Sequence, residues 1–327
     1  MIRTLFLYLV NLLVYIIIWI RNKLYDLNWL HIEPSKIPVI SVGNIQMGGA
    51  GKTPFVIALT QKLLDNQITP VIITRGYKRK TSNQIIFQDI KDFNAIEVGD
   101  EPYYMKQVLQ RVPIIIDNNK KRAVKTANGM ANVDCIILDD GYQTRYIKKD
   151  IDIALVNTWK KGQFSYIMPF GYLREPIQNL KRADFIYTTK GSNKHSSLEG
   201  FQTKHIDIIF ELIKYDQNSI GNKQSKIEKK ENQRLVAFAG IANPKHFFEI
   251  LNQLEIVPDE KIIFQNHQIY ELKNSNLKKS KDIIYITTYK DFVKLKSLKT
   301  DVYVLNMKFI INDLNLLEAI KTKINEN

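Results

Sequence analysis

A glycine-rich loop that follows a buried strand and opens a helix constrains the fold of this chain more than any other feature. From Ile40 to Pro54 the sequence reads ISVGNIQMGGAGKTP. Glycines let the backbone approach a ligand closely, so successive N–H groups can surround phosphate oxygens at the positive end of the helix. Lys52 can neutralise the β and γ oxygens of a nucleotide, and the Thr53 hydroxyl can ligate Mg²⁺. The segment therefore predicts a P-loop, although Gln46 stands where the strict pattern has glycine. An ordinary glycine turn is the alternative.

The residues that we expect to hold the nucleotide phosphates are those of the loop and of the first helical turn. Each can offer a backbone N–H, and two of them add a side chain. They are Gln46, Met47, Gly48, Gly49, Ala50, Gly51, Lys52 and Thr53.

Two carboxylates follow a second buried strand, as the metal ion of a P-loop enzyme requires. Four apolar residues, Cys135–Leu138, precede Asp139 and Asp140. Because ligands of open α/β sheets sit at the carboxyl ends of the strands, we expect both carboxylates near Lys52. Asp139 and Asp140, together with Thr53, are therefore the candidate Mg²⁺ ligands. The alternative is that the pair only caps the turn at Gly141.

The rest of the chain alternates between short β-branched runs and amphipathic stretches, which is typical of a parallel sheet with helices on its faces. We expect a P-loop NTPase-type α/β domain over residues 25–200, with helices on both faces of its sheet, and a smaller α/β domain over residues 201–327 joined by a hinge. A helix is expected from about Thr53 to Asp65. The expected strands are Pro38–Val42, Pro70–Thr74, Val112–Ile116, Asp134–Leu138, Ile151–Val156, Asp184–Thr188, His205–Tyr215, Leu235–Ala239, Lys261–Phe264, Ile283–Thr287 and Asp301–Leu305.

The N-terminal residues 1–24 read as a membrane anchor helix. Thr4–Ile20 carries seventeen uncharged residues, nearly all large and apolar, and Arg21 and Lys23 follow it. At about 1.5 Å per residue this run reaches roughly 25 Å, against about 30 Å of hydrocarbon, so both a spanning and an in-plane helix stay open. Bulky and charged residues after the run (WIRNK) do not suit a cleaved signal peptide. A buried helix of a soluble protein is the alternative, but such helices usually keep a polar face.

The charge balance favours an anionic partner surface. Lys and Arg outnumber Asp and Glu by 47 to 33, which gives a formal charge of +14 and suits a negatively charged membrane leaflet or a nucleic acid. A merely soluble, lysine-rich surface is the alternative. A single cysteine, Cys135, excludes an intrachain disulfide and fits a reducing compartment.

With these motifs placed, the sequence resembles the bacterial lipid A 4′-kinase (tetraacyldisaccharide 4′-kinase) family. The loop has that family's form, including the absence of the first glycine. Further matches follow in the family's order. They are Arg75–Tyr77 (RGY), Val98–Pro102 (VGDEP), Leu138–Gln143 (LDDGYQ), Gly171–Pro176 (GYLREP), Ala239–Pro244 (AGIANP), Phe264–His267 (FQNH) and Thr287–Asp291 (TTYKD).

The resemblance implies an enzyme of lipid A biosynthesis, a Mg²⁺-dependent kinase that uses ATP. Its acceptor is the 4′-hydroxyl of a tetraacylated disaccharide 1-phosphate. It further implies a protein held at the anionic cytoplasmic face of the bacterial inner membrane, with no obligate protein partner and no nucleic acid. Three positions depart from the family's usual residues: Thr144 stands for His, Asn266 for Asp and Tyr289 for Glu.

A sugar hydroxyl is a poor nucleophile at neutral pH, so a base that accepts its proton would help. With the resemblance in hand, Asp100 is the candidate base, and His267 would hold its orientation as the second member of a dyad. The alternative for Asp100 is a helix N-cap. Four further residues are secondary candidates for contacts with phosphate or metal: Arg122, Gln143, Arg174 and Glu175.

Two other functions compete. A membrane-associated P-loop NTPase switch protein would be expected to carry a guanine-reading Asn-Lys-x-Asp motif, and the sequence has none. A nucleic-acid-binding protein is suggested by charge alone, because the basic residues are scattered and form no recognisable reading module.

Overall fold

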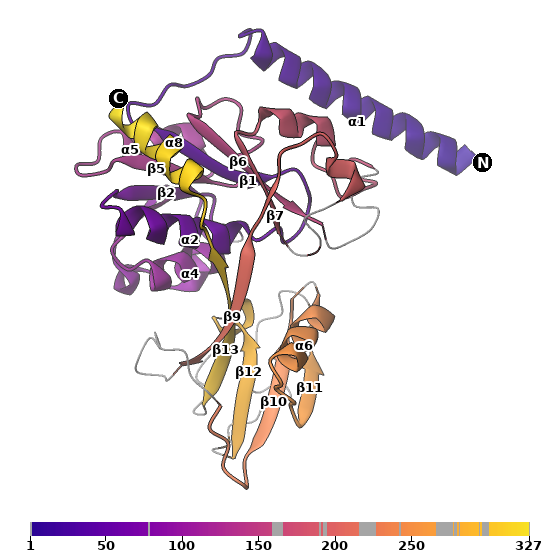
Figure 1. Cartoon of the computed structure of the whole chain (residues 1–327), viewed down its shortest axis with the longest axis vertical. Coiled ribbons are helices and arrows are strands. Elements are labelled where there is room, and N and C mark those ends of the chain that lie inside the picture. The colour runs from indigo at the N-terminus through magenta and orange to yellow at the C-terminus, as the bar shows by residue number, and fades with distance from the viewer. Residues whose placement is uncertain are drawn as a thin grey trace. The chain divides into compact units, whose positions relative to one another are not determined.

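The computed structural model describes residues 2–77, 79–158, 166–189, 191, 195–215, 227–241, 243–265, 277, 280, 282–293, 295 and 301–326. The chain forms two compact units (Figure 1), Met1–Asp207 with Phe309–Asn327 and Ile208–Lys308. We expected the smaller domain to run from residue 201 to the C-terminus, whereas residues 309–327 belong to the first unit.

The first unit is built on an eight-stranded sheet with the order β3-β4-β2-β5-β1-β6-β7-β8. All the pairings are parallel except that of β3 with β4. The P-loop strand β1 lies between β5 and β6, where neighbouring strands can shield it on both edges. The strands are β1 (Val39–Asn44), β2 (Pro70–Thr74), β3 (Ile85–Phe87), β4 (Ile114–Ile116), β5 (Cys135–Asp139), β6 (Ile151–Asn157), β7 (Phe185–Thr189) and β8 (Lys204–His205).

Helices cover both faces of this sheet, as expected. Alternate residues of a strand point to opposite faces. Val39 and Ile136 pack with Ala123 and Val124 of α5 on one face, while α2 lies against β1, β2 and β5. The helical segments of this unit are α1 (Ile2–Asp26), α2 (Lys52–Asp65), η1 (Ile90–Asp92), α3 (Ala95–Val98), α4 (Asp100–Val108), α5 (Lys120–Ala127), η2 (Ile177–Arg182), η3 (Ser196–Leu198) and α8 (Leu314–Asn325).

The second unit contains a five-stranded sheet with the order β11-β10-β12-β13-β9. Its core forms where Phe247 and Leu251 of α6 pack on Ala237 and Ile286 of the sheet. The elements are β9 (Asp207–Tyr215), β10 (Arg234–Ala239), α6 (Pro244–Gln253), β11 (Glu260–Ile263), β12 (Ile283–Thr288), α7 (Tyr289–Phe292) and β13 (Val302–Ile310). The fold class expected from the sequence is confirmed. The short strand β3 was not anticipated.

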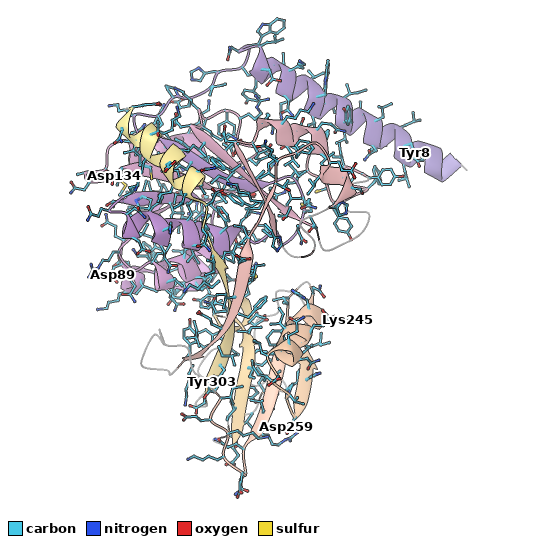
Figure 2. All side chains as sticks on the ribbon, in the orientation of Figure 1. Tyr8, Asp89, Asp134, Lys245, Asp259 and Tyr303 are labelled. Carbon is cyan, nitrogen blue, oxygen red and sulfur yellow. The ribbon has the colours of Figure 1, made fainter. Side chains whose placement is uncertain are left out.

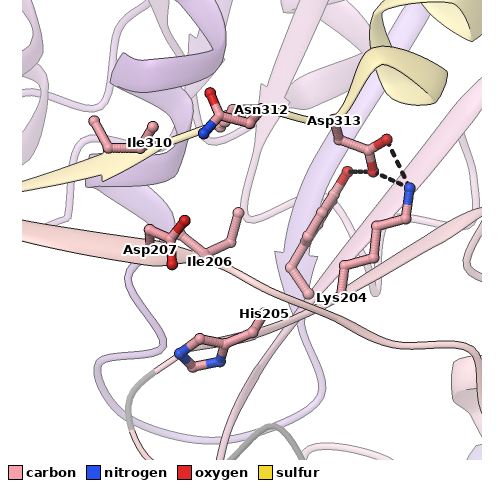
Figure 3. A pocket seen from close by; sticks show the side chains of 9 residues that line it. Lys204, His205, Ile206, Asp207, Ile310, Asn312 and Asp313 are labelled. Carbon is pink, nitrogen blue, oxygen red and sulfur yellow. Dashed lines mark hydrogen bonds and ion pairs between the residues drawn. The ribbon is translucent and has the colours of Figure 1, made fainter.

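A small pocket of the first unit marks where the chain leaves that unit and where it returns (Figure 3). It is lined by Tyr187 of β7, by Lys204–Asp207 from β8 to the start of β9 and by Ile310–Asp313 at the end of β13. Asp313 accepts hydrogen bonds from Tyr187 Oη at 2.6 Å and from Lys204 Nζ at 2.6 and 2.7 Å. These bonds attach the start of α8 to β7 and β8, and explain why the C-terminal helix belongs to the first unit.

Helix α1 packs along the first unit on one side only. Val14 and Ile18 pack against the cluster around Tyr142, and Asn11 Nδ2 donates to Ile167 O at 2.8 Å. Tyr8, labelled on α1 in Figure 2, has its Oη 3.1 Å from Tyr166 Oη. Within the described residues, α1 is the one helix long and apolar enough to cross a membrane, over Leu7–Asp26. The exposed large residues of α1 are Tyr8, Leu9, Leu12, Leu13, Tyr15, Ile16, Ile17, Trp19 and Ile20.

Candidate phosphate-binding site

The second half of the glycine loop has the geometry of a phosphate cradle. Gly48 and Gly51 adopt φ angles of 97° and 81°, which L side chains rarely take. A Cβ at Gly51 would also lie 2.4 Å from Phe309 Cζ. Glycine is therefore required at this position both by the φ angle and by the lack of space for a side chain. Helix α2 starts directly at Lys52. The N–H groups of its first turn have no partner inside the helix, as at every helix start, and so suit anionic oxygens.

The first half of the loop is tied to the protein instead. The Gln46 side chain bonds the backbone of Asn157 twice, through Nε2 to the carbonyl at 2.9 Å and through Oε1 to the N–H at 2.8 Å. The Met47 N–H donates to Tyr172 O at 2.5 Å, and Gln46 forms an antiparallel bridge with Leu173. The buried glutamine thus fastens the loop to the end of β6, a bond that a glycine could not make. The Ala50 N–H donates to Gly48 O at 3.0 Å. Phosphate oxygens therefore have Gly48, Gly49, Gly51, Lys52 and Thr53 left to bind.

Lys52 reaches from the start of α2 to the carboxyl end of β5. Its Nζ lies 3.4 Å from Asp140 Oδ1 and donates to Asn44 Oδ1 at 3.5 Å. Arg174 Nη1 approaches the same carboxylate, at 2.8 Å from Oδ1 and 3.0 Å from Oδ2. Burial raises the pKa of Asp140, but Lys52 and Arg174 outweigh it and lower this pKa to about 2. The carboxylate is therefore ionised at every physiological pH.

Asp139 is the most informative acid of the site. It is 4% exposed. One oxygen, Oδ2, accepts from Thr74 Oγ1 at 2.8 Å, while Oδ1 has no hydrogen-bond partner among the described residues. Burial first, then the charges of Glu101 and Asp140, raise the pKa of Asp139 to about 6. A buried oxygen with no partner beside two further carboxylates suits a cation.

The side chains present suit a Mg²⁺ ion that also binds phosphate and water, rather than a metal held by protein ligands alone. Mg²⁺ is usually held by one or two carboxylates together with substrate phosphates and water. Within the described residues no three His, Cys, Asp or Glu side chains converge to a preformed metal cluster. Thr53, Asp139 and Asp140 supply a hydroxyl and two carboxylates, and the unpaired Asp139 Oδ1 meets the requirement for a vacant ligand position.

Lys120, which the sequence analysis did not single out, supports this acidic turn from behind. It is fully buried, and its Nζ donates to Asp139 O at 2.7 Å and to Asp140 O at 2.8 Å. Burial lowers the pKa of Lys120 to about 7 against the opposing pull of Asp140 and Asp139. Asp140 has a φ of 49°, and two bonds from one ammonium group stabilise that left-handed turn. Lys120 lies on the buried side of α5 with Ala123, Val124 and Ala127, a helical spacing that could have revealed it.

Three of the secondary candidates form one network. Gln143 Nε2 donates to Asn44 O and to Glu175 Oε1, both at 2.8 Å, and its Oε1 lies 3.4 Å from Arg174 Nη1. Glu175 is fully buried and also accepts from Asn179 Nδ2 at 2.8 Å and Arg182 Nη2 at 2.9 Å. These residues hold the ends of β1 and β5 together around the Lys52–Asp140 pair.

Arg122, the fourth secondary candidate, lies in a structural ion pair. Its Nε donates to Asp117 Oδ2 at 2.7 Å and its Nη2 to Asp117 Oδ1 at 2.8 Å. Asp117 is fully buried, and losing its partner would leave a buried charge. The structure thus gives Arg122 a role in holding α5 to the end of β4.

The candidate base and its neighbour open helix α4. Asp100 is the first residue of that helix, after Gly99 with a φ of 96°. Glu101 comes close enough to raise the pKa of Asp139, so the VGDEP segment reaches the candidate metal ligands. The sequence analysis missed Glu101, although it belongs to that motif. His267 and Asn266 lie outside the described residues. Of the other departures, Thr144 is buried in the turn after β5, and Tyr289 is buried at the start of α7.

Comparisons with known proteins place the chain in a family. A family model described as tetraacyldisaccharide-1-P 4′-kinase matches residues 3–325. Proteins named tetraacyldisaccharide 4′-kinase from Halothermothrix orenii and Aquifex aeolicus are 33% and 31% identical, covering 92% and 89% of this chain and 84% and 90% of their own lengths. A solved structure, LpxK from Aquifex aeolicus in complex with ATP, superposes with a TM-score of 0.79 at 29% identity, over 99% of this chain and 100% of that one.

Proposed function

The chain belongs to the tetraacyldisaccharide-1-phosphate 4′-kinase family, and we propose that it transfers the γ-phosphoryl group of ATP to the 4′-hydroxyl of a tetraacylated disaccharide 1-phosphate, a step of lipid A biosynthesis. The observation that carries this proposal is the Lys52–Asp140 pair at 3.4 Å. It brings a P-loop lysine to the acidic end of β5 within a chain that the family matches from residue 3 to 325.

Mg²⁺ would be held by Thr53, Asp139 and Asp140, with Glu101 close by. When bound, the ion neutralises negative charge on the phosphate oxygens of the nucleotide. The chain's own cations share this task. Lys52, at the start of α2, and Arg174, on the far side of Asp140, would stabilise charge on the transferring group. The phosphate oxygens would displace neither the Gln46 nor the Met47 bonds, since the remaining N–H groups between Gly48 and Thr53 are enough to surround them.

In the transfer step a bond forms between the 4′-oxygen and the γ-phosphorus, and the bond from that phosphorus to the β–γ bridging oxygen breaks. ADP leaves with the electron pair of the broken bond. The proton of the hydroxyl passes to the Asp100 carboxylate, which acts as the general base. His267, which belongs by sequence to the second unit, would orient that carboxylate. The roles of both residues rest on the resemblance of their motifs and on the position of Asp100 beside Glu101.

We further propose that α1 lies in the plane of the membrane surface rather than across the bilayer. Its inward stripe, Asn11, Val14, Ile18 and Asn22, follows a helical spacing and packs on the first unit. If α1 spanned the bilayer, the part of the first unit that packs against this stripe would have to lie in the hydrocarbon core. An in-plane helix instead places only its exposed apolar side in the lipid, which is the arrangement of interfacial helices. Lys23, exposed in the last turns of the helix, would then meet anionic headgroups at the cytoplasmic face.

The exposed loop beside α1 extends this apolar surface. Tyr166, Met168, Phe170 and Tyr172 are between 36% and 51% exposed, and the loop contacts α1 through the bond from Asn11. Because Tyr172 O accepts from the Met47 N–H, this surface adjoins the start of the P-loop. A lipid substrate held in the same interface would have its headgroup next to the phosphate site.

The reaction can be tested with purified full-length protein, Mg-ATP and the disaccharide 1-phosphate lipid in mixed micelles. We expect mass spectrometry to show a bis-phosphorylated lipid in amounts equal to the ADP formed. ADP formation without a phosphorylated lipid would point to a simple NTPase and would overturn the proposal.

A further inference from the structure

The turn that carries Asp139 and Asp140 also contacts the end of α1. Five residues after Asp140, the Arg145 side chain, 14% exposed, donates from Nη1 to Asn22 O at 2.9 Å and from Nη2 to Asp26 Oδ1 at 2.8 Å. Its guanidinium also lies 5.3 Å from the centre of the Tyr25 ring. These three contacts fasten Arg145 to the last turns of one helix.

The segment between Asp140 and Arg145 is short and closely hydrogen-bonded. The Thr144 N–H donates to Gly141 O at 2.8 Å and the Arg145 N–H to Gln143 O at 3.0 Å. A Cβ at Gly141 would lie 2.5 Å from Ser41 Oγ, so the turn is pressed against β1. A displacement of Arg145 would therefore be passed to Gln143 and Asp140 rather than absorbed by a loose loop.

A second contact runs in parallel through Glu175. Asn22 Nδ2 lies 3.5 Å from Glu175 Oε2, and Arg21, half-buried beside it, interacts with the same carboxylate. Glu175 binds Gln143, and its neighbour Arg174 binds Asp140. The end of α1 thus meets both segments that carry the ligands around Asp140. Glu175 also keeps Gln143, Asn179 and Arg182 as partners, so this second contact adds to the double bond from Arg145 and does not replace it.

We propose that the final turn of α1 positions the phosphate site. Arg145 is the positioning residue: it binds α1 through its side chain and fixes the turn that carries Asp139 and Asp140. The membrane helix then does more than locate the enzyme: its docking keeps the acids and Arg174 in the geometry that binds the nucleotide. This inference rests on the proposed kinase function for its catalytic consequence, and on hydrogen-bond geometry for its consequence in nucleotide binding.

The test measures nucleotide affinity without lipid, by titration of full-length protein in detergent with a fluorescent ATP analogue and Mg²⁺, alongside kcat and both KM values in micelles. Arg145→Met removes both guanidinium hydrogen bonds to α1. Arg145→Lys keeps the charge but not the double contact, and Asp26→Asn weakens one contact at an exposed carboxylate with no danger to the fold. Arg234→Met, which breaks an exposed ion pair with Glu260 in the second unit, is the matched control.

We expect Arg145→Met to lower nucleotide affinity and kcat by about tenfold to a hundredfold, since misplacement by about 1 Å can cost that much. Arg145→Lys and Asp26→Asn should follow with smaller losses in that order, while KM for the lipid, vesicle binding and the control stay at the wild-type level. If the variants unfold at lower temperature but keep wild-type nucleotide affinity and kcat, or if only the lipid KM rises, the proposal is wrong. Should Arg145→Met fail to fold, the two milder variants decide. Should wild-type protein not phosphorylate the lipid, the proposed function fails, and the nucleotide titration still decides the inference.

Discussion

Lys52 Nζ lies 3.4 Å from Asp140 Oδ1, across the gap between the start of α2 and the end of β5. The pair joins the two motifs that the sequence separates by 88 residues, counted from Lys52 to Asp140. Arg174 binds the same carboxylate from the other side. The charge of Asp140 thus holds two cations where the phosphates of a nucleotide are expected.

Lys52→Ala should abolish turnover and leave the fold intact. The shape of the loop comes from its glycines and from the Gln46–Asn157 bonds, and Asp140 keeps Arg174 as a partner. Removing a charge that stabilises the transition state should lower kcat by at least about a thousandfold. The measurement is single-turnover phosphorylation together with thermal unfolding. Near-normal turnover at unchanged stability would contradict the P-loop assignment.

Asp139 should make the stability of the protein depend on Mg²⁺. The pKa of this acid in the folded protein is raised to about 6, so its ionisation opposes folding. The free-energy cost grows as the pH rises from the ordinary pKa of an aspartate to about 6. Mg²⁺ bound between the acids offsets that penalty, so at pH 8 the ion should raise the unfolding temperature of the wild type by roughly 2–4 °C.

Asp139→Asn is the matched variant for this prediction. It removes the charge but keeps an oxygen to accept from Thr74. Without Mg²⁺ it should be no less stable than the wild type at pH 8, and addition of the ion should not shift its unfolding temperature. A Mg²⁺-induced shift of the wild-type size in Asp139→Asn would place the ion elsewhere.

The sequence predicted those parts of the site that local patterns encode. The P-loop, the acidic end of β5 and the positions of most strands along the chain depend on spacing within short segments. Lys120 and Arg145 were missed because their importance comes from contacts with residues far along the chain, which a single sequence does not contain. Lys120 lies in a run of basic residues, a pattern that usually indicates solvent-exposed surface. Its helical spacing with Ala123 and Ala127 nevertheless places it on the buried side of α5. The role of the Gln46 side chain in fastening the loop to Asn157 was not predicted; a phosphate contact of its backbone N–H stays a prediction.

The membrane-facing side of α1 can be tested with one charge. Leu13 is 56% exposed, on the side opposite to Val14 and Ile18. Leu13→Glu should lower the partition of the protein into anionic vesicles by roughly tenfold or more, because a charge is costly in the apolar part of an interface. The contacts of α1 with the first unit should persist, so the unfolding temperature should change little. Vesicle flotation at low and high salt measures the effect.

Leu314→Glu is the control for that experiment. Leu314 is 66% exposed at the start of α8, and the same change there should leave vesicle binding unaltered. Equal losses in both variants would indicate a general charge effect. High salt weakens binding through the basic surface but not binding through apolar side chains. If Leu13→Glu still binds vesicles at high salt as well as the wild type does, this side of α1 is not the membrane contact.

Cys135 should be inert in the native protein. It is buried in β5, and burial, with a smaller contribution from Asp134, raises the pKa of its thiol to about 12. The thiolate is the reactive form, so alkylation by iodoacetamide at pH 8 should proceed only after unfolding in denaturant. Intact-mass analysis before and after denaturation would show it. Rapid native alkylation would mean that β5 opens readily, which its central place in the sheet contradicts.

Asp100 and His267 should act as one catalytic unit. If His267 works by orienting Asp100, losing Asp100 removes most of what His267 contributes, so the double change to Ala should cost little more than Asp100→Ala alone. Loss of the general base should lower kcat by about a hundred- to ten-thousand-fold with little change in nucleotide affinity. His267→Ala should cost less, because a carboxylate can still accept a proton when it is imperfectly held. Single-turnover rates of the four proteins complete the cycle. If the two logarithmic losses add, the residues act independently and the dyad is refuted, even if each proves important.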